Sequence, residues 1–301
     1  MTQRALGMQL MRSWLFVPGN RPRMIQKAPI LGADVIVYDL EDALPSAEKA
    51  SGRRLVAEAL EAPSGGSLRY VRVEADPGRG LEDARAVVRS GLDGLVLPKV
   101  SEVSVLHQTD AALGALEAKA GMEPGSVRIL AMIESARGLL AAPAIAAASP
   151  RMVGLFFGAE DFTLDLGVFA SDEEGPDEML YARSSVAVAA ASCGLVAVDR
   201  IVPEFQTLDP LAADSKRACQ LGFGGKGVIH PRQIACVHQA FTPSEKQVEK
   251  ARQVIRDFEQ AHREGAGTVQ VDGKMVDWPI VEKARRLIQV AEASKSEENE
   301  L

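Results

Sequence analysis

The sequence predicts a (β/α)₈ barrel followed by a smaller C-terminal appendage. Short β-branched runs alternate with longer segments rich in Ala, Leu and Arg over most of the 301 residues. This alternation is typical of parallel strands joined by crossover helices. Runs such as Val35-Ile36-Val37 are apolar on both faces, as expected for strands that are covered on both sides. Eight such runs favour a closed barrel over an open doubly wound sheet, and one barrel of about 250 residues fits the length.

The expected strands follow one another at regular intervals, at residues 13–17, 35–39, 68–73, 94–97, 127–133, 152–157, 195–198 and 227–229. Amphipathic segments between them, such as residues 47–60, 81–90 and 176–192, are long enough to be crossover helices. The glycine-rich segment 222–227 precedes a strand rather than a helix. We therefore interpret it as a turn and not as a phosphate-binding loop.

The pattern changes after the eighth strand, so we place the catalytic barrel at residues 1–240 and an appendage at 241–301. Ser244 is a plausible N-cap for a charged helix that reaches about residue 262. Residues 268–271 alternate, Asp272-Gly273 is a hairpin turn signal, and 274–276 returns as a strand. A last helix over about 279–293 precedes a tail, 295–301, that is too polar to pack and is expected to be disordered.

The composition indicates a globular enzyme-sized protein rather than a nucleic-acid-binding or membrane protein. Hydrophobic residues make up 47% and charged residues 25% of the chain, enough for a sizeable core. The net charge of −7 disfavours a broad nucleic-acid-binding face, although a local cationic pocket can still hold an anion. Three cysteines without metal-ligand spacing are expected to be reduced thiols. With no signal peptide and no apolar run of about 18 residues, the expected location is the cytoplasm.

Charged side chains follow the expected strands at the edge where the loops to the helices begin. Six of the eight strand ends carry an acid, a base or a histidine, and in a (β/α)₈ barrel these ends converge on one mouth where the chemistry occurs. The groups, in chain order, are Asp39, Glu41 and Asp42; Arg72 and Glu74; Pro98-Lys99; Glu134; Gly158-Ala159-Glu160-Asp161; and His230-Pro231.

Glu134 and Asp161 are the predicted metal ligands. Mg²⁺ prefers hard oxygen ligands and keeps several waters, so two carboxylates and substrate oxygens suffice. The alternative for either acid is that it caps the following helix or pairs with an arginine such as Arg137. The small residues Gly158 and Ala159 let the backbone of 158–160 approach a carboxylate or an oxyanion closely.

Arg72 lies between apolar residues of its strand and is expected to point inward. A buried arginine needs a partner, and a substrate carboxylate is a natural bidentate one. A salt bridge to Asp39 or Glu41 is the structural alternative, and it is compatible with the functional role.

The ordered motifs identify the chain as similar to a known family. They are the segment 12–22 (RSWLFVPGNRP), Asp39-Leu40-Glu41-Asp42, residues 97–99 (LPK), Ile133-Glu134, residues 158–162 (GAEDF) and residues 229–231 (IHP). Together they resemble the citrate lyase β-subunit-like family of the HpcH/HpaI aldolase superfamily, which includes malyl-CoA, β-methylmalyl-CoA and citramalyl-CoA lyases. The resemblance runs from about residue 12 to residue 288.

This resemblance implies an Mg²⁺-dependent lyase, with Mn²⁺ as an alternative metal, that cleaves or condenses a 3-hydroxyacyl-CoA thioester to acetyl-CoA or propionyl-CoA and a 2-oxo acid. It implies a homotrimer or a hexamer. By the resemblance, Glu134 and Asp161 bind the metal and Arg72 contacts the 2-oxo-acid carboxylate. Arg21 and Lys27 fall where the family contacts the CoA phosphates. Asp277 would reach a neighbouring subunit's site as the acid/base at the acetyl methyl carbon.

Several points stay open from the sequence. The base for the hydroxyl proton could be Glu41, Asp42 or a metal-bound water. The thioester could be carried by an acyl-carrier protein, as for the β subunit of citrate lyase, or the enzyme could be a metal-dependent 2-oxo-acid aldolase that uses no CoA. Many relatives have Asn where this chain has Glu74. We expect this extra carboxylate near the mouth and expect it to change which acyl group fits.

Overall fold

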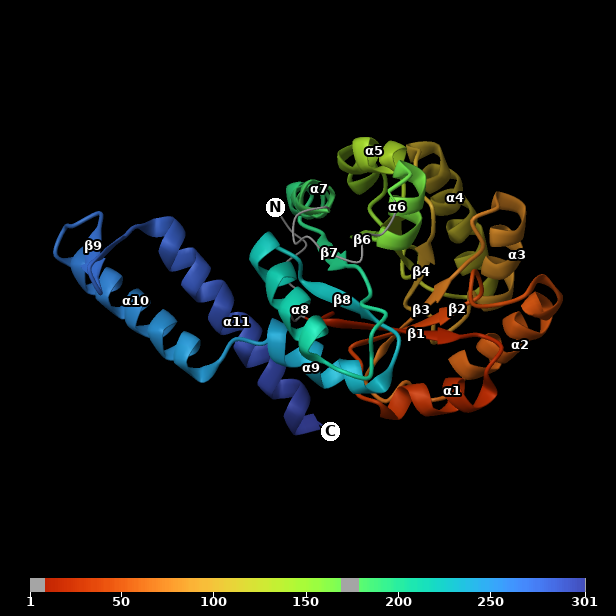
Figure 1. Ribbon diagram of the computed structural model, residues 1–301, viewed down its shortest axis with the longest axis horizontal. Helices are drawn as coiled ribbons and strands as arrows, with labels where there is room; N and C mark the ends of the chain where they lie inside the picture. The colour runs from red at the N-terminus through yellow and green to blue at the C-terminus, as the bar shows by residue number, and fades with distance from the viewer. Residues whose placement is uncertain (1–8, 169–178, 301) are drawn as a thin grey trace. The chain divides into compact units, whose positions relative to one another are not determined.

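The computed structural model describes residues 9–168 and 179–300 and divides them into two compact units (Figure 1). Residues 11–237 form the larger unit, and residues 238–300 with residues 9 and 10 form the smaller one. Within the described residues no helix is both long enough and apolar enough to cross a membrane.

The larger unit is built on a closed barrel of eight parallel strands in sequential order, which confirms the predicted (β/α)₈ fold. The barrel closes where Ser13 of the first strand pairs with Lys226 of the last. The strands are β1 (Ser13–Pro18), β2 (Val35–Asp39), β3 (Leu68–Arg72), β4 (Gly94–Leu97), β5 (Arg128–Ile133), β6 (Met152–Phe157), β7 (Val196–Asp199) and β8 (Gly225–Val228).

Helices follow the strands and surround the barrel. They are α1 (Pro22–Lys27), α2 (Lys49–Leu60), α3 (Pro77–Val87), α4 (Val103–Ala120), α5 (Ala136–Ala146), α6 (Ala159–Leu166), α7 (Leu180–Ser192), α8 (Asp209–Leu221) and α9 (Pro231–Phe241), with short 3₁₀ turns at Ala28–Ile30 and Ser46–Glu48. Local chemistry sets their ends: the Ser135 side chain accepts from the Gly138 amide at the start of α5, and Gly121 ends α4 in the left-handed conformation. The predicted helix 176–192 begins at Leu180, and its residues 176–178 lie outside the described residues.

The barrel interior is filled by alternate residues of the strands, so it is a packed core and not a channel. Its buried members are Trp14, Val35, Val37, Tyr70, Val96, Leu130, Met132, Phe156 and Val198. Because the centre is closed by apolar side chains, a polar site can form only where the strands end.

The glycine-rich segment corrects one prediction, because part of it is a strand and not a turn. Residues 225–227 belong to β8 and pair with β1 and β7. Side chains at Gly225 and Gly227 would collide with the Met11 carbonyl oxygen and with Phe156, respectively, so close packing requires glycine there. Lys226 between them is fully buried and donates to Asp199 and Asp214 at 2.7 and 2.5 Å. The low strand propensity of Gly and Lys hid the start of this strand, which was expected at residue 227.

The smaller unit is a helix, a hairpin and a second helix: α10 (Glu245–Arg263), β9 (Val269–Val271), β10 (Lys274–Val276) and α11 (Trp278–Glu300). Ser244 and Gln247 form a capping box at the start of α10, and Asp272 and Gly273 both have positive φ in the hairpin turn. α11 continues beyond residue 293, where we expected it to end. Its last residues are rich in Glu, Lys and Ser and contain no Gly or Pro to stop a helix.

Candidate active site

A pocket of about 320 Å³ opens where the strands end, and the predicted acids and Arg72 converge on it. The charged lining residues are Asp39, Asp42, Arg72, Glu134, Glu160 and Asp161. The rest of the lining includes an apolar wall, formed by Phe16, Met132, Phe156, Ile201 and Ile229. A small concave site that combines an apolar wall with a few convergent charges is typical of a binding site for a small organic acid.

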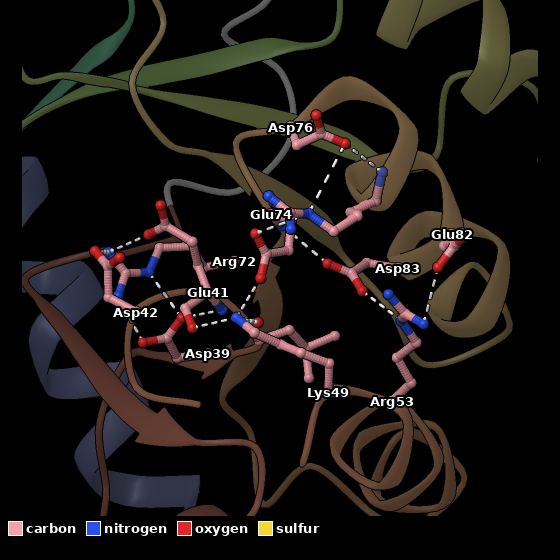
Figure 2. A network of polar contacts seen from close by, with 12 residues as sticks. Asp39, Glu41, Asp42, Lys49, Arg53, Arg72, Glu74, Asp76, Glu82 and Asp83 are labelled. Carbon is pink, nitrogen blue, oxygen red and sulfur yellow. Dashed lines mark hydrogen bonds and ion pairs between the residues drawn. The ribbon is translucent and has the colours of Figure 1, made fainter. Parts of the chain in front are cut away.

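Arg72 ends β3 and points into the barrel mouth, where its side chain is 11% exposed. It forms a bidentate pair with Asp39, with Nε and Nη2 donating at 2.8 and 2.6 Å, and Nη1 lies 3.1 Å from a Glu41 carboxylate oxygen (Figure 2). Burial works against its charge, but the hydrogen bonds and charges of Asp39, Glu41 and Asp42 outweigh burial and raise the pKa of Arg72. A guanidinium has five N–H donors. Asp39 fixes its plane, and Nη1 faces the Glu41 and Asp42 carboxylates at 3.1 and 3.6 Å.

Lys99 is a further cation at the mouth, and its role was not predicted from the sequence. It follows β4 with a φ of 54°, a conformation that costs a non-glycine residue energy. In this conformation the Lys99 amide donates to Glu134 Oε2 at 2.7 Å. The ammonium group lies 2.9 Å from a Glu41 oxygen and 4.0 Å from an Asp161 oxygen. One strained residue therefore connects the acids after β2 to the predicted metal pair.

Glu41 and Asp42 lie side by side after β2 and have different environments. Glu41 is buried, and burial raises its pKa to about 7 against the opposing effects of Arg72 and Lys99. Asp42 lines the pocket. Its partial burial alone would raise its pKa, but the hydrogen bond with Glu41 and the charges of Arg72 and Lys99 lower it. Two neighbouring carboxyl groups with separated pKa values can share and pass on a proton.

Glu134 and Asp161 both line the pocket, as the metal assignment requires. Glu134 does not cap the following helix, because Ser135 does, and Arg137 pairs with Glu102 at 2.7 Å instead. Asp161 lies in the first turn of α6, 4.0 Å from the Lys99 ammonium group. Burial raises the pKa of Glu134 to about 7, and the nearby charge of Asp161 adds to the shift. The like charges are thus close enough to interact.

This donor set fits a hard divalent cation. Among residues 9–168 and 179–300 no three His, Cys, Asp or Glu side chains are arranged to hold a metal. The two carboxylates would therefore be joined by oxygens of water or of a bound acid, an arrangement that Mg²⁺ accepts. The mouth also brings six carboxylates, from Asp39, Glu41, Asp42, Glu134, Glu160 and Asp161, together with the two cations Arg72 and Lys99.

The segment 158–161 forms the first turn of α6 beside these acids. The Gly158 amide donates to the Ile133 carbonyl oxygen at 3.1 Å, so it is not available to a ligand as we had expected. The amides of Ala159 and Glu160 begin the helix, and no side chain caps them; amides at a helix start can bind an anion. Gly158 is required for another reason, because a side chain there would collide with Glu134.

The other predicted residues lie away from the pocket lining. Glu74 corrects an expectation: its carboxylate pairs with Lys49 and does not line the pocket. Arg21 and Lys27 are exposed at the two ends of α1, which follows β1. Asp277 belongs to the smaller unit, between β10 and α11. The proposed roles of Arg21, Lys27 and Asp277 remain predictions.

The apolar wall was also missed, although the sequence contains a signal for it. Side chains two positions apart on a strand share a face, so Met132 and Phe156 precede Glu134 and Gly158 on the inward face. Phe205 and His230, in the segments that follow β7 and β8, stack with ring centroids 4.9 Å apart. No spacing in the sequence predicts that pair.

The chain is similar to a known protein family and to several named proteins. A family model described as HpcH/HpaI aldolase/citrate lyase matches residues 12–231. The citrate lyase subunit beta of Leuconostoc mesenteroides subsp. cremoris is 38% identical over 290 residues, which cover 95% of each protein. A (3S)-malyl-CoA thioesterase of Cereibacter sphaeroides is 36% identical over 286 residues, 94% of this chain and 95% of that protein.

A solved structure of the protein CitE from Mycobacterium tuberculosis, in complex with magnesium, acetoacetate and coenzyme A, is similar with a TM-score of 0.75 and 29% identity, over 95% of this chain and 100% of that one. The family model covers well over half of the chain, and the relatives align over nearly all of it. The chain therefore belongs to the HpcH/HpaI aldolase/citrate lyase family and is an enzyme of the carbon–carbon lyase type.

Proposed function

We propose that this enzyme uses Mg²⁺ to cleave, or in reverse to form, a 3-hydroxyacyl-CoA thioester such as malyl-CoA or citramalyl-CoA. The products are acetyl-CoA or propionyl-CoA and a 2-oxo acid. The observation that carries the proposal is that Glu134, Asp161 and Arg72 face one small pocket. Two carboxylates suited to a hard cation and a buried, oriented guanidinium are the groups needed to hold an α-hydroxy or α-oxo carboxylate.

The chemistry requires two proton transfers around one C–C bond cleavage. The hydroxyl group loses its proton and becomes the carbonyl of the 2-oxo acid, while the electron pair of the broken bond forms the thioester enolate. That enolate then takes a proton on carbon. When bound, Mg²⁺ would supply positive charge beside the carboxylate and hydroxyl oxygens and so lower the pKa of the hydroxyl group. Arg72 would orient the carboxylate through its donors that Asp39 does not use.

The acidic pair after β2 is the candidate acceptor for the hydroxyl proton. Asp42 lines the pocket, and Glu41, whose pKa is raised to about 7 by burial, lies directly behind it. A group with a pKa near neutrality is suited to general acid–base work. Protonation of the enolate carbon is assigned to Asp277 of a neighbouring subunit. The exposed cations Arg21 and Lys27 on α1 would hold the CoA phosphates.

Self-association into a trimer or hexamer is part of the proposal, and the surface of the barrel unit supports it. Helices α6 and α7 both contact α5 (Figure 1). Four large apolar side chains on these helices are more than two-thirds exposed: Leu140, Leu164, Tyr181 and Val188. Exposed apolar surface gathered in one region marks protein–protein contacts. Light scattering should give a mass of three or six chains, and Leu140→Glu should lower it. A monomeric wild-type protein would contradict this part.

A panel of thioesters tests the function. We expect at least one of malyl-, β-methylmalyl-, citramalyl- and citryl-CoA to be cleaved in the presence of Mg²⁺ and none after chelation of the metal. Citryl-acyl-carrier protein belongs in the panel, because relatives named citrate lyase subunit beta align over nearly the whole chain. Selective cleavage of that substrate would favour the citrate lyase alternative. Cleavage of free hydroxy-oxo acids alone would favour the CoA-independent aldolase.

A further inference from the structure

Lys49 is a largely buried lysine at the start of a helix, where a positive charge is unfavourable. It is the first residue of α2, where the helix dipole disfavours a positive charge. Its side chain is nevertheless 13% exposed and points back toward the loop that follows β2 (Figure 2). The ammonium group donates to the carbonyl oxygens of Leu40 and Glu41 at 2.7 and 2.5 Å and pairs with the Glu74 carboxylate. These three contacts use all three donors of the ammonium group.

The contacts of Lys49 complete the hydrogen bonding of the acid-bearing loop. The Leu40 amide donates to the Arg72 carbonyl oxygen at 2.9 Å, and the Glu41 amide donates to Asp39 Oδ1 at 2.9 Å. Lys49 donates to both carbonyl oxygens of this dipeptide, and the Glu41 carbonyl oxygen also accepts from the Leu44 amide at 3.1 Å. Because buried backbone groups need partners, Lys49 contributes to fixing this dipeptide, chiefly at Leu40.

Glu74 holds Lys49 from the far side. Its own amide donates to Asp83 Oδ2 at 2.9 Å, and Asp83 in turn accepts from Arg53 Nε at 2.6 Å (Figure 2). Glu74 is therefore fixed through its main chain, and its carboxylate, 12% exposed, is directed at Lys49. The ammonium group of Lys49 therefore lies between the Glu74 carboxylate and the loop, and its contacts restrict its movement toward solvent.

We propose that Lys49 is a positioning residue of the reaction: held by Glu74, it fixes the Leu40–Glu41 backbone so that the Glu41 and Asp42 carboxylates stand against Arg72 and Lys99. This inference rests on the proposed function. It assigns to Glu74 a role that acts through Lys49 and not through contact with the substrate.

The chain offers a matched pair of charge-neutral variants for the test. Lys49→Met with Glu74→Gln removes the contacts to the loop without leaving a buried charge unpaired. Arg12→Met with Asp34→Asn removes a similar buried ion pair, with Nε 2.9 Å from Oδ2, just before the starts of β1 and β2. An asparagine at 34 can still accept from the Arg12 amide. Both variants keep the net charge of the protein.

We expect kcat of the Lys49→Met/Glu74→Gln enzyme to fall about tenfold to a hundredfold, as for a small misplacement of catalytic groups, while the Mg²⁺ concentration for half-maximal activity stays within about threefold. The Arg12→Met/Asp34→Asn enzyme should retain kcat when each enzyme is assayed at the same interval below its own Tm. Amide hydrogen exchange at residues 40–44 should accelerate in the first variant alone. An unchanged kcat with unchanged exchange at this loop would overturn the proposal, as would equal losses in both variants.

Two further measurements keep the test decisive. If the first variant does not fold, Lys49→Gln replaces it, since it keeps a donor for a carbonyl oxygen but loses the ion pair; a lower kcat supports the proposal and an unchanged one refutes it. If the wild-type enzyme cleaves no thioester, the proposed function fails, but the exchange at residues 40–44 still decides whether Lys49 orders the loop.

Discussion

Substitution of Gly158 by alanine tests the metal site most directly, because it perturbs Glu134 without changing any ligand. The backbone of Gly158 is extended, with φ −93° and ψ 97°, so alanine introduces no backbone strain. Its new Cβ would lie 2.5 Å from Glu134 Cγ and 2.8 Å from Cδ. Carbon atoms pack at about 3.5–4.0 Å, so the Glu134 side chain must shift by about 1 Å.

Such a shift is costly, because Glu134 is held in place. Its Oε2 accepts the Lys99 amide at 2.7 Å, and moving away stretches or breaks that bond. Loss of a group that orients a metal ligand lowers metal affinity by about 10- to 100-fold. Overpacking of a buried site lowers the free energy of unfolding by about 1–3 kcal/mol. We therefore expect the Gly158→Ala protein to fold and to bind Mg²⁺ about 10- to 100-fold more weakly.

Calorimetric titration with Mg²⁺, repeated with Mn²⁺, measures this change. Gly114→Ala is the control: it lies within α4, its new Cβ would meet nothing closer than Arg151 at 3.9 Å, and alanine favours the helix. That variant should bind metal as the wild type does. If Gly158→Ala also binds Mg²⁺ within twofold of the wild type, Glu134 does not contribute a ligand in this conformation.

Three other predictions concern single residues. Asp277→Asn should slow deuterium wash-in at the methyl group of acetyl-CoA by about a hundredfold with Mg²⁺ binding unchanged; unaltered wash-in, followed by NMR, would remove Asp277 from the reaction. Arg72→Lys keeps the charge but not the bidentate geometry, and should lower kcat/KM by about a hundredfold; a full kcat/KM would contradict the carboxylate contact. Burial opposes the charge of Glu117, but hydrogen bonds from Arg151 and two backbone amides lower its pKa from 4.5 to about 2. Its contribution to stability is therefore complete above about pH 4.5 and is lost as the pH falls toward 2. Urea unfolding should show Glu117→Gln less stable than the wild type by on the order of 3 kcal/mol at pH 7, and a constant difference down to pH 3 would refute the argument.

The strands could be predicted well because the apolar residues that they bury form recognisable runs in the sequence. Seven of the eight begin within one residue of the expected position, since a strand covered on both faces is a continuous apolar run. β8 was the exception. Its Lys226 is buried by pairing with Asp199 and Asp214, residues 27 and 12 positions away. A hydrophobic pattern contains no information about a charge that is neutralised by a distant partner.

In the site, too, the sequence predicted where residues lie but not which residues they contact. The convergence of Arg72, Glu134 and Asp161 followed from strand ends alone, because all parallel strands of a barrel end at one mouth. The contacts of Lys99 did not, because they depend on a positive φ that a lysine rarely adopts. Sequence spacing therefore identified which residues reach the mouth, and the structure shows which of them hold one another.

The side chain of Glu74 does not follow the alternation of the strand before it. Arg72 and Glu74 are two positions apart, which on one strand would put both side chains on the inward face. β3, however, ends at Arg72, and the Glu74 amide turns to Asp83 of α3, so the carboxylate meets Lys49 instead of the pocket. A residue that lines the pocket changes the ranking of substrates, whereas one that holds the catalytic loop changes all of them alike. Glu74→Gln should therefore scale kcat by a similar factor for every thioester that the wild type cleaves, and a reversed order of preference would show that Glu74 reaches the substrate after all.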